Sequence, residues 1–327
     1  HRGLQAWEGK GTLEEGWLLG NLIGDGCFSE SEVNFSHQAK LRYWGETQEV
    51  MKSYALTLSQ SIENAKPAKG FYHSQNKYYE IGSAALFQLA ARYGVTRENK
   101  TITAKIEEAS YAFYCGFLRG LFDADGSVQG TQEKGTSIRL AQSNSAMLEA
   151  VQRMLLRLGV TSAIYQNRRT AGFRFMPDSQ KQPKEYWCQA QHELVIANDN
   201  LPVFAEVIGF QDPIKAERLE HLLAGYKRNL NRDRFTATIA SISPDGVEPV
   251  YDCTVPSVHR FDANGLVAHN CGEILGADFH CVSGDTFLIT KDGIHSIRDL
   301  VGRTVEIWNG KQWSQVIPVL TGKERSL

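Results

Sequence analysis

A short segment that occurs twice constrains the fold of this chain more than any other feature. EEGWLLGNLIGDGCF (residues 14–28) and CGFLRGLFDADGSV (115–128) align without gaps, and Asp25 matches Asp125 at an offset of 100 positions. A duplicated segment at a fixed offset indicates two copies of one structural unit that bury a shared core. We therefore expect two similar halves rather than one continuous domain.

Each copy of the segment predicts a helix with a face of very small residues. Gly20 and Gly24 in the first copy correspond to Gly120 and Ala124 in the second. Residues at i and i+4 lie on one side of a helix, and small residues there let a partner backbone approach closely. We expect the two helices to pack on each other, each followed by strands and a further helix, in an α+β fold.

The aspartate of each copy is expected at the last turn of its helix, because the glycine that follows is a natural left-handed residue after a helix end. A carboxylate is poorly placed there, since the helix end is already partly negative. A divalent cation removes this objection and prefers oxygen ligands. We predict a metal site formed by Asp25, Asp125 and the carbonyls of Gly24 and Ala124. One such helix would be unremarkable in isolation, but two in matched register favour the metal.

Apolar periodicity predicts two further helices. SAMLEAVQRMLLRLGV (145–160) and GSAALFQLAARYGV (82–95) both end in Gly-Val, and we interpret them as counterparts in the two halves. The stretches after each repeated segment alternate in the manner of strands. Each half is thus expected to run helix, strands, helix.

Basic residues gather in one place although the whole chain is not basic. The chain has 35 Lys and Arg against 37 Asp and Glu, so any surface for nucleic acid must be local. Residues 167–184 carry five basic side chains with Phe173 and Phe175 interleaved. A solvated surface loop explains this composition equally well. The five are Arg168, Arg169, Arg174, Lys181 and Lys184.

The paired segments resemble the LAGLIDADG homing endonucleases in their single-chain form, over roughly residues 11–225. The resemblance implies two pseudo-symmetric αββαββα repeats, at about 11–100 and 106–225, in a monomer whose saddle-shaped sheets lie on the major groove of double-stranded DNA. It also implies that Asp25 and Asp125 hold Mg²⁺ for phosphodiester hydrolysis. The function so implied is a metal-dependent double-strand break.

The same resemblance implies a catalytic lysine in each half. Lys100 and Lys215 lie in the matching blocks, with Lys105 as a competitor of Lys100. DNA contacts are expected from Arg139, Arg168, Arg169, Arg174 and Lys181. Two alternatives stay open: a scaffold whose endonuclease activity has decayed, and an RNA maturase with the same fold.

A different pattern begins at residue 247. VEPVYDCTV (247–255) and RFDANGLVAHNC (260–271) predict short strands, and they resemble the C-terminal blocks of inteins. The resemblance implies that Asn270 cyclises and cuts the chain, and that Cys271 receives the upstream chain as a thioester. His269 then assists the leaving group, His259 shuttles a second proton and Asp252 tunes the network.

Two more resemblances follow directly. CGEILGADFH (271–280) is similar to the active-site stretch of ribonucleotide reductases, and the residues from Cys281 onward resemble the opening block of an intein, with Cys281 as its nucleophile. The resulting division gives residues 1–10 as the tail of a splicing half, 226–270 as an all-β Hint segment, 271–280 as a host peptide and 281–327 as the start of a second intein. Ten host residues are too few for a reductase.

Neither intein is complete in this sequence, so splicing is expected to depend on missing segments in cis or in trans. One further hypothesis concerns the order of the pieces. If residues 281–327 folded onto 226–270, Cys271 and Cys281 would flank the decapeptide, and splicing would release it as a circle. Six Cys without a CxxC pair and the lack of a long apolar run predict a cytoplasmic protein with no membrane partner.

Overall fold

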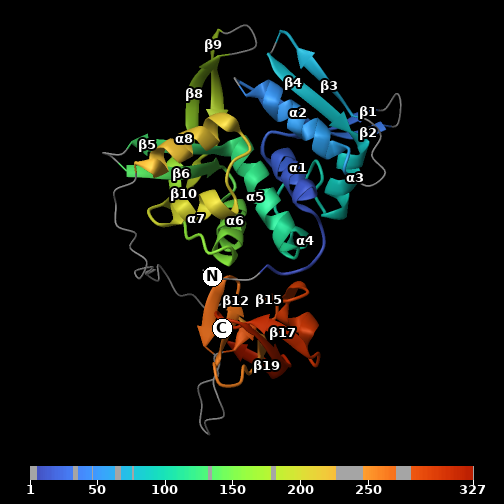
Figure 1. Cartoon of the computed structure of the whole chain (residues 1–327), viewed down its shortest axis with the longest axis vertical. Coiled ribbons are helices and arrows are strands. Elements are labelled where there is room, and N and C mark those ends of the chain that lie inside the picture. Colours follow the sequence, from blue (N-terminus) through green and yellow to red (C-terminus); the bar gives the residue numbers. More distant parts are fainter. Residues whose placement is uncertain are drawn as a thin grey trace.

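The molecule consists of two similar α/β halves and a smaller β body made by the C-terminal residues (Figure 1). None of the helices in the described part of the chain is long and apolar enough to cross a membrane. The computed structural model describes residues 6–31, 36–45, 47–62, 68–75, 77–131, 135–177, 182–225, 246–269 and 281–326.

The first half is a four-stranded antiparallel sheet with helices packed against it. The sheet order is β1-β2-β4-β3. The first helix begins at a capping box, in which the Thr12 side chain and the Glu15 carboxylate each accept a hydrogen bond from the other's main-chain nitrogen, both at 3.2 Å. The elements are α1 (Leu13–Gly24), β1 (Cys27–Ser31), β2 (Ser36–Trp44), α2 (Gln48–Ser59), β3 (Lys69–His73), β4 (Tyr78–Ser83) and α3 (Ala84–Arg92).

The second half repeats this order with one insertion. Its sheet order, β5-β6-β10-β7, is equivalent to that of the first half, and the β8–β9 hairpin is inserted between β7 and β10. The expected mixed α+β fold is confirmed. After the short α4 (Ala104–Glu107), the elements are α5 (Tyr111–Asp125), β5 (Gly126–Thr131), β6 (Gly135–Gln142), α6 (Ser145–Arg157), β7 (Ala163–Arg169), β8 (Gly172–Pro177), β9 (Pro183–Cys188), β10 (Gln191–Ala197), α7 (Asn200–Val207) and α8 (Pro213–Ala224).

The two helices that end in Gly-Val are not counterparts, so that prediction was wrong. α6 follows the second strand of its half and corresponds to α2, whereas α3 follows the fourth strand and corresponds to α7. Gly94 and Gly159 both adopt positive φ, of 73° and 78°. The shared ending therefore reflects a left-handed residue that stops any helix, which is a local requirement and carries no information on topology.

The seam between the halves is formed by α1 and α5, which run side by side at the centre of the molecule (Figure 1). Their backbones approach closely at glycines on both helices. A Cβ added to Gly20 would lie 2.1 Å from the carbonyl oxygen of Phe117, and a Cβ on Gly120 would lie 2.1 Å from that of Trp17. The expected packing of the two small-residue faces is confirmed.

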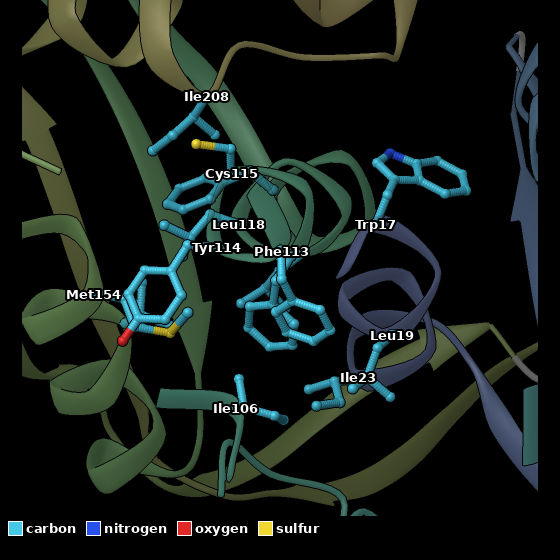
Figure 2. Close-up of a cluster of buried hydrophobic side chains, with 14 of the residues drawn as sticks. Trp17, Leu19, Ile23, Ile106, Phe113, Tyr114, Cys115, Leu118, Met154 and Ile208 are labelled. Carbon is cyan, nitrogen blue, oxygen red and sulfur yellow. The ribbon is translucent and has the colours of Figure 1, made fainter. Parts of the chain in front are cut away.

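Side chains from both halves form one hydrophobic core around this seam. Figure 2 shows Leu19 and Ile23 from α1 in the same cluster as Phe113 and Leu118 from α5 and Met154 from α6, and all five are buried. The cluster therefore spans both halves. The two carboxylates that end α1 and α5 are thus placed by one packed unit.

Residues on both sides of 270–280 fold into a single β body. β11 pairs with β14 and with β19, so a strand that precedes this segment lies between two strands that follow it. Cys253 and Phe261 share a buried cluster with Leu288 and Ile307. The elements are β11 (Val247–Asp252), β12 (Arg260–Ala263), β13 (Leu266–His269), β14 (Val282–Ser283), β15 (Phe287–Thr290), β16 (Gly293–Ser296), the 3₁₀ helix η1 (Ile297–Leu300), β17 (Val305–Trp308), β18 (Trp313–Val316) and β19 (Val319–Ser326).

The β body contacts the base of the second half through a buried arginine. The guanidinium of Arg157 lies 5.5 Å from the centre of the Phe287 ring and donates a hydrogen bond to Glu107 at 2.9 Å. Arg153 donates to the same carboxylate at 2.6 Å. A buried charge is costly unless it is paired, so the ion pairs with Glu107 hold the Arg157 guanidinium in place. The Phe287 ring of the β body then packs against a fixed group of the second half.

Candidate functional site

Asp25 and Asp125 lie side by side at the end of the helix seam. Asp25 follows the last residue of α1, and Asp125 is the last residue of α5. A Cβ added to Gly24 would lie 2.4 Å from the Cβ of Ala124 and 3.5 Å from Cγ of Asp125. The close approach of the backbones therefore brings the two carboxylates together.

The glycine after each aspartate has a different role from the one expected. Gly126 has φ −77° and enters β5, and Gly26 is also outside the left-handed region. A Cβ on Gly26 would lie 2.6 Å from Cδ1 of Leu22, and one on Gly126 would lie 2.5 Å from the carbonyl oxygen of Phe122. Glycine is required here because the chain turns back tightly onto its own helix.

The surroundings of the two carboxylates disfavour their charged forms. Burial raises the pKa of Asp25, against the opposing charges of Lys215 and Lys100. Burial and the neighbouring charge of Asp25 raise the pKa of Asp125 to about 6, although Gln142 donates a hydrogen bond to it at 2.5 Å. Burial and a like charge both penalise ionisation.

Lys100 and Lys215 make similar contacts at the ends of α1 and α5, next to the two aspartates. Nζ of Lys100 donates to the carbonyls of Gly24 at 2.9 Å and Gly26 at 2.6 Å. Nζ of Lys215 donates to the carbonyls of Asp123 at 2.5 Å and, at 3.4 Å, Ala124. Each lysine thus satisfies carbonyls that the helix end leaves without partners.

Lys105, the competitor of Lys100, lies elsewhere. Its Nζ donates to the carbonyl of Arg92 at 3.3 Å. Burial lowers the pKa of Lys100, and the charges of Asp125 and Asp25 oppose this shift. The structure therefore brings Lys100, rather than Lys105, to the carboxylate pair.

The residues at the seam suit a divalent cation. Within the described residues, no cluster of three or more His, Cys, Asp or Glu side chains forms a metal site. The side-chain ligands would be Asp25 and Asp125, whose mutual repulsion a cation relieves. The carbonyls of Gly24 and Ala124 already accept from the lysines, but a carbonyl oxygen has a second lone pair.

A third buried acid was missed by the sequence reasoning. Asp123 accepts hydrogen bonds from Nε1 of Trp17 at 2.8 Å and from the main-chain nitrogens of Gln211 and Asp212 at 2.9 and 3.0 Å. Burial outweighs these bonds and raises the pKa of Asp123 to about 6. The available signal was a departure from the repeat, because the first copy has Ile23 at this position.

The predicted DNA-contacting residues lie on or beyond the second sheet. Arg139 on β6 and Arg168 on β7 both reach Glu193, at 3.2 and 3.5 Å. Arg169 ends β7, and Arg174 on β8 donates to the carbonyl of Thr170 at 2.9 Å. Lys181 lies outside the described residues.

The predicted splicing residues lie in the β body as far as the structure describes them. The rings of His259 and His269 are stacked with centroids 6.4 Å apart. Nδ1 of His259 is buried without a hydrogen-bond partner among the described residues. Oδ1 of Asp252 accepts from the nitrogen of Cys253 at 2.7 Å. Asn270 and Cys271 lie outside the described residues.

The thiol of Cys281 has a partner that the sequence reasoning did not identify. Its Sγ lies 3.0 Å from Oγ1 of Thr321, and that hydroxyl donates to the carbonyl of Val250 at 3.1 Å. Val282 pairs with Tyr251 on β11. Cys281 therefore directly precedes β14, the strand that lies beside the VYD stretch.

The electrostatics of the seam predict a stability effect. We expect Asp125→Asn to raise the thermal midpoint of the metal-free protein at neutral pH, because it removes a buried charge while the amide oxygen can still accept from Gln142. The folded pKa of about 6 exceeds the usual 3.8 of an aspartate, so the charged form costs stability in full above pH 6, and this cost declines as the pH falls from 6 towards 3.8.

The measurement is thermal unfolding of both proteins across this pH range. The advantage of the variant should shrink below pH 6, and Mg²⁺ should stabilise the unsubstituted protein more than the variant at neutral pH. A variant less stable than the parent at neutral pH would contradict the assignment of a destabilising charge.

The chain is similar in sequence to several known proteins. Residues 112–209 match the LAGLIDADG-like domain family. The ribonucleoside-diphosphate reductase NrdEB subunit alpha of Bacillus subtilis (strain 168) is 28% identical over 278 residues, which are 79% of this chain and 25% of that protein. The DNA polymerase of Thermococcus hydrothermalis is 26% identical over 280 residues, 81% of this chain and 16% of that protein.

The chain thus spans a quarter or less of the length of these relatives. Among solved structures, a mesophilic variant of the homing endonuclease I-DmoI is 18% identical, with a TM-score of 0.43, covering 64% of this chain and 97% of that one. The residues that match the LAGLIDADG-like domain family lie within the second half of the pair.

Proposed function

Since residues 112–209 match the LAGLIDADG-like domain family, we propose that this chain is a site-specific DNA endonuclease that makes a metal-dependent double-strand break. The observation that carries the proposal is the adjacency of Asp25 and Asp125 at the end of a pseudo-symmetric helix pair. Two halves related in this way suit a duplex whose two strands are also related by a twofold axis.

The residues at the seam would have different roles in phosphodiester hydrolysis. Asp25 and Asp125 would hold the divalent cation, Mg²⁺ being the expected one. When bound, such a cation lowers the pKa of a water molecule and neutralises charge on the scissile phosphate. Lys100 and Lys215 hold the helix-end carbonyls in place and add positive charge beneath the site. Gln142 orients the Asp125 carboxylate.

Cleavage of a plasmid tests this proposal. The substrate carries the uninterrupted gene of the host reductase, and linear product should form with Mg²⁺ and not with EDTA. DNA binding without any cut would favour the alternative of a decayed endonuclease scaffold. Binding of RNA without DNA cleavage would favour a maturase instead.

We also propose protein-splicing chemistry in the β body. The supporting observation is that β11, which precedes residues 270–280, pairs with two strands that follow them, and the circular-peptide hypothesis depends on such an arrangement. The stacked His259 and His269 and the hydrogen-bonded thiol of Cys281 lie in the same body.

The proposed steps exchange bonds without any added reagent. The Cys281 thiol displaces its own nitrogen from the carbonyl of residue 280, and the Cys271 thiol then displaces the Cys281 sulfur. The side-chain nitrogen of Asn270 attacks its own carbonyl, closes a succinimide and releases the Cys271 amine. That amine takes the acyl group from its own sulfur and closes a ten-residue circle.

Mass spectrometry of the purified chain tests this second activity. We expect cyclic CGEILGADFH from the parent and none from Asn270→Ala, in which no succinimide can form. His269→Ala should slow release by about 10²-fold, the usual contribution of a proton donor. Intact chain alone, or simple cleavage after Asn270, would refute the cyclisation.

A further inference from the structure

Each half carries a glutamate at the same place on its sheet. Glu80 lies on β4 and Glu193 on β10, the third strand in the order of each sheet. The next residue in each strand is buried, and so is the residue opposite it on the neighbouring strand. Ile81 lies opposite Leu41, and Leu194 lies opposite Leu140. Because side chains alternate along a strand, both glutamates point to the face opposite the helices.

The neighbours of the glutamates are also repeated. Oε1 of Glu80 lies 2.8 Å from Nζ of Lys40, and Oε2 lies 3.0 Å from Nε of Arg42. His73 lies at 4.0 Å. Two basic groups from the second strand of the sheet thus converge on one carboxylate that is only 8% exposed.

In the second half, Glu193 likewise takes two basic partners. Nη1 of Arg139 lies at 3.2 Å and Nε of Arg168 at 3.5 Å. On the outer strand of each sheet an exposed aromatic residue stands directly opposite the glutamate, Phe71 beside Glu80 and Tyr165 beside Glu193. The carboxylate, one basic partner on the second strand and the opposed aromatic therefore recur in both halves, whereas the second basic partner comes from β2 in the first half and from β7 in the second. The sequence alignment of the repeats does not show this motif.

The ionisation of Glu80 is settled by its partners. Burial raises its pKa, but the hydrogen bonds from Lys40 and Arg42 outweigh burial, and the pKa lies below its usual value. The carboxylate is charged at neutral pH, where it repels phosphate and accepts hydrogen bonds. In a major groove, the donors available to it are the amino groups of cytosine and adenine.

We propose that Glu80 and Glu193 are matched specificity-determining residues of the DNA-facing surface, each holding its two basic side chains toward the base edges and away from the phosphates. This rests on the proposed DNA-binding function. Phosphate contacts supply affinity without sequence information, whereas base contacts supply sequence information. The glutamates therefore lower nonspecific affinity and sharpen discrimination.

The test compares Glu80→Gln and Glu193→Gln with the parent, using a fluorescent duplex pool of random sequence. Each variant should bind the pool roughly three- to tenfold more tightly, and the slope of log affinity against log salt should steepen by about one, because one more cation is free for phosphate. Glu306→Gln is the matched control, since Glu306 pairs with Lys291 in the β body at 3.2 Å. It should change neither quantity.

Selection from the same pool, followed by sequencing, supplies the readout that a structural role would not move. Glu80→Gln should weaken the sequence preference in one half of the selected DNA motif, and Glu193→Gln should weaken it in the other half. Glu80→Asp and Glu193→Asp keep the charge and should retain the parental slope, which tests the idea even if a glutamine variant unfolds.

The outcomes separate the two proposals. A parent that binds DNA, with glutamine variants that match Glu306→Gln in affinity and slope, overturns the role of the glutamates alone. A single variant that weakens the sequence preference in both halves of the motif also overturns the role of the glutamates. A parent that does not bind the duplex pool defeats the endonuclease proposal and this inference with it.

Discussion

Asp25→Asn or Asp125→Asn should abolish double-strand cleavage, lowering the rate by on the order of 10³-fold or more. In the proposed site each carboxylate is a cation ligand, and the described residues contain no cluster of three or more His, Cys, Asp or Glu side chains that could hold the cation without it. An asparagine keeps the shape of the side chain and removes its charge. The loss would therefore follow from cation binding rather than from packing.

Linearisation of the target plasmid with Mg²⁺ measures this effect. Asp199→Asn is a suitable control, because Asp199 lies between β10 and α7 and belongs to neither of the two seam helices. Both seam variants should still bind duplex DNA. Cleavage at the parental rate by either variant would show that the paired carboxylates are not the catalytic centre.

Gly20→Ala or Gly120→Ala should destabilise the chain by about 3 kcal/mol or more, at the upper end for overpacked cores. The new methyl group would lie 2.1 Å from a main-chain carbonyl oxygen of the partner helix. A backbone atom cannot rotate away as a side chain can, so the helices must separate. Separation would also pull Asp25 from Asp125, and we expect cleavage to fall with stability.

Chemical denaturation measures the stability change. Gly172→Ala on β8 is the control, because a Cβ there would meet nothing within 4 Å. Its free energy of unfolding should stay within about 0.5 kcal/mol of the parent. A Gly120→Ala protein as stable as Gly172→Ala would mean that the two helices do not pack backbone to backbone.

Much of the central unit could be predicted because its information is local. The small residues and the aspartates recur at one offset, and helix geometry converts that spacing into a face and an end. The same local reading failed for the helices that end in Gly-Val, since a left-handed glycine stops a helix wherever it occurs in the fold. Asp123 was missed because it appears in one copy only.

The sequence by itself determined that two similar halves meet at a pair of glycine-rich helices and that each helix ends in a carboxylate. Only the tertiary structure decided which lysine reaches the seam, which residues surround Glu80 and Glu193, and that β11 is completed by strands beyond residue 280. The physical reason is distance along the chain. Helix faces follow from spacing within a few residues, whereas strand pairing and ion pairs join residues that only the folded chain brings together.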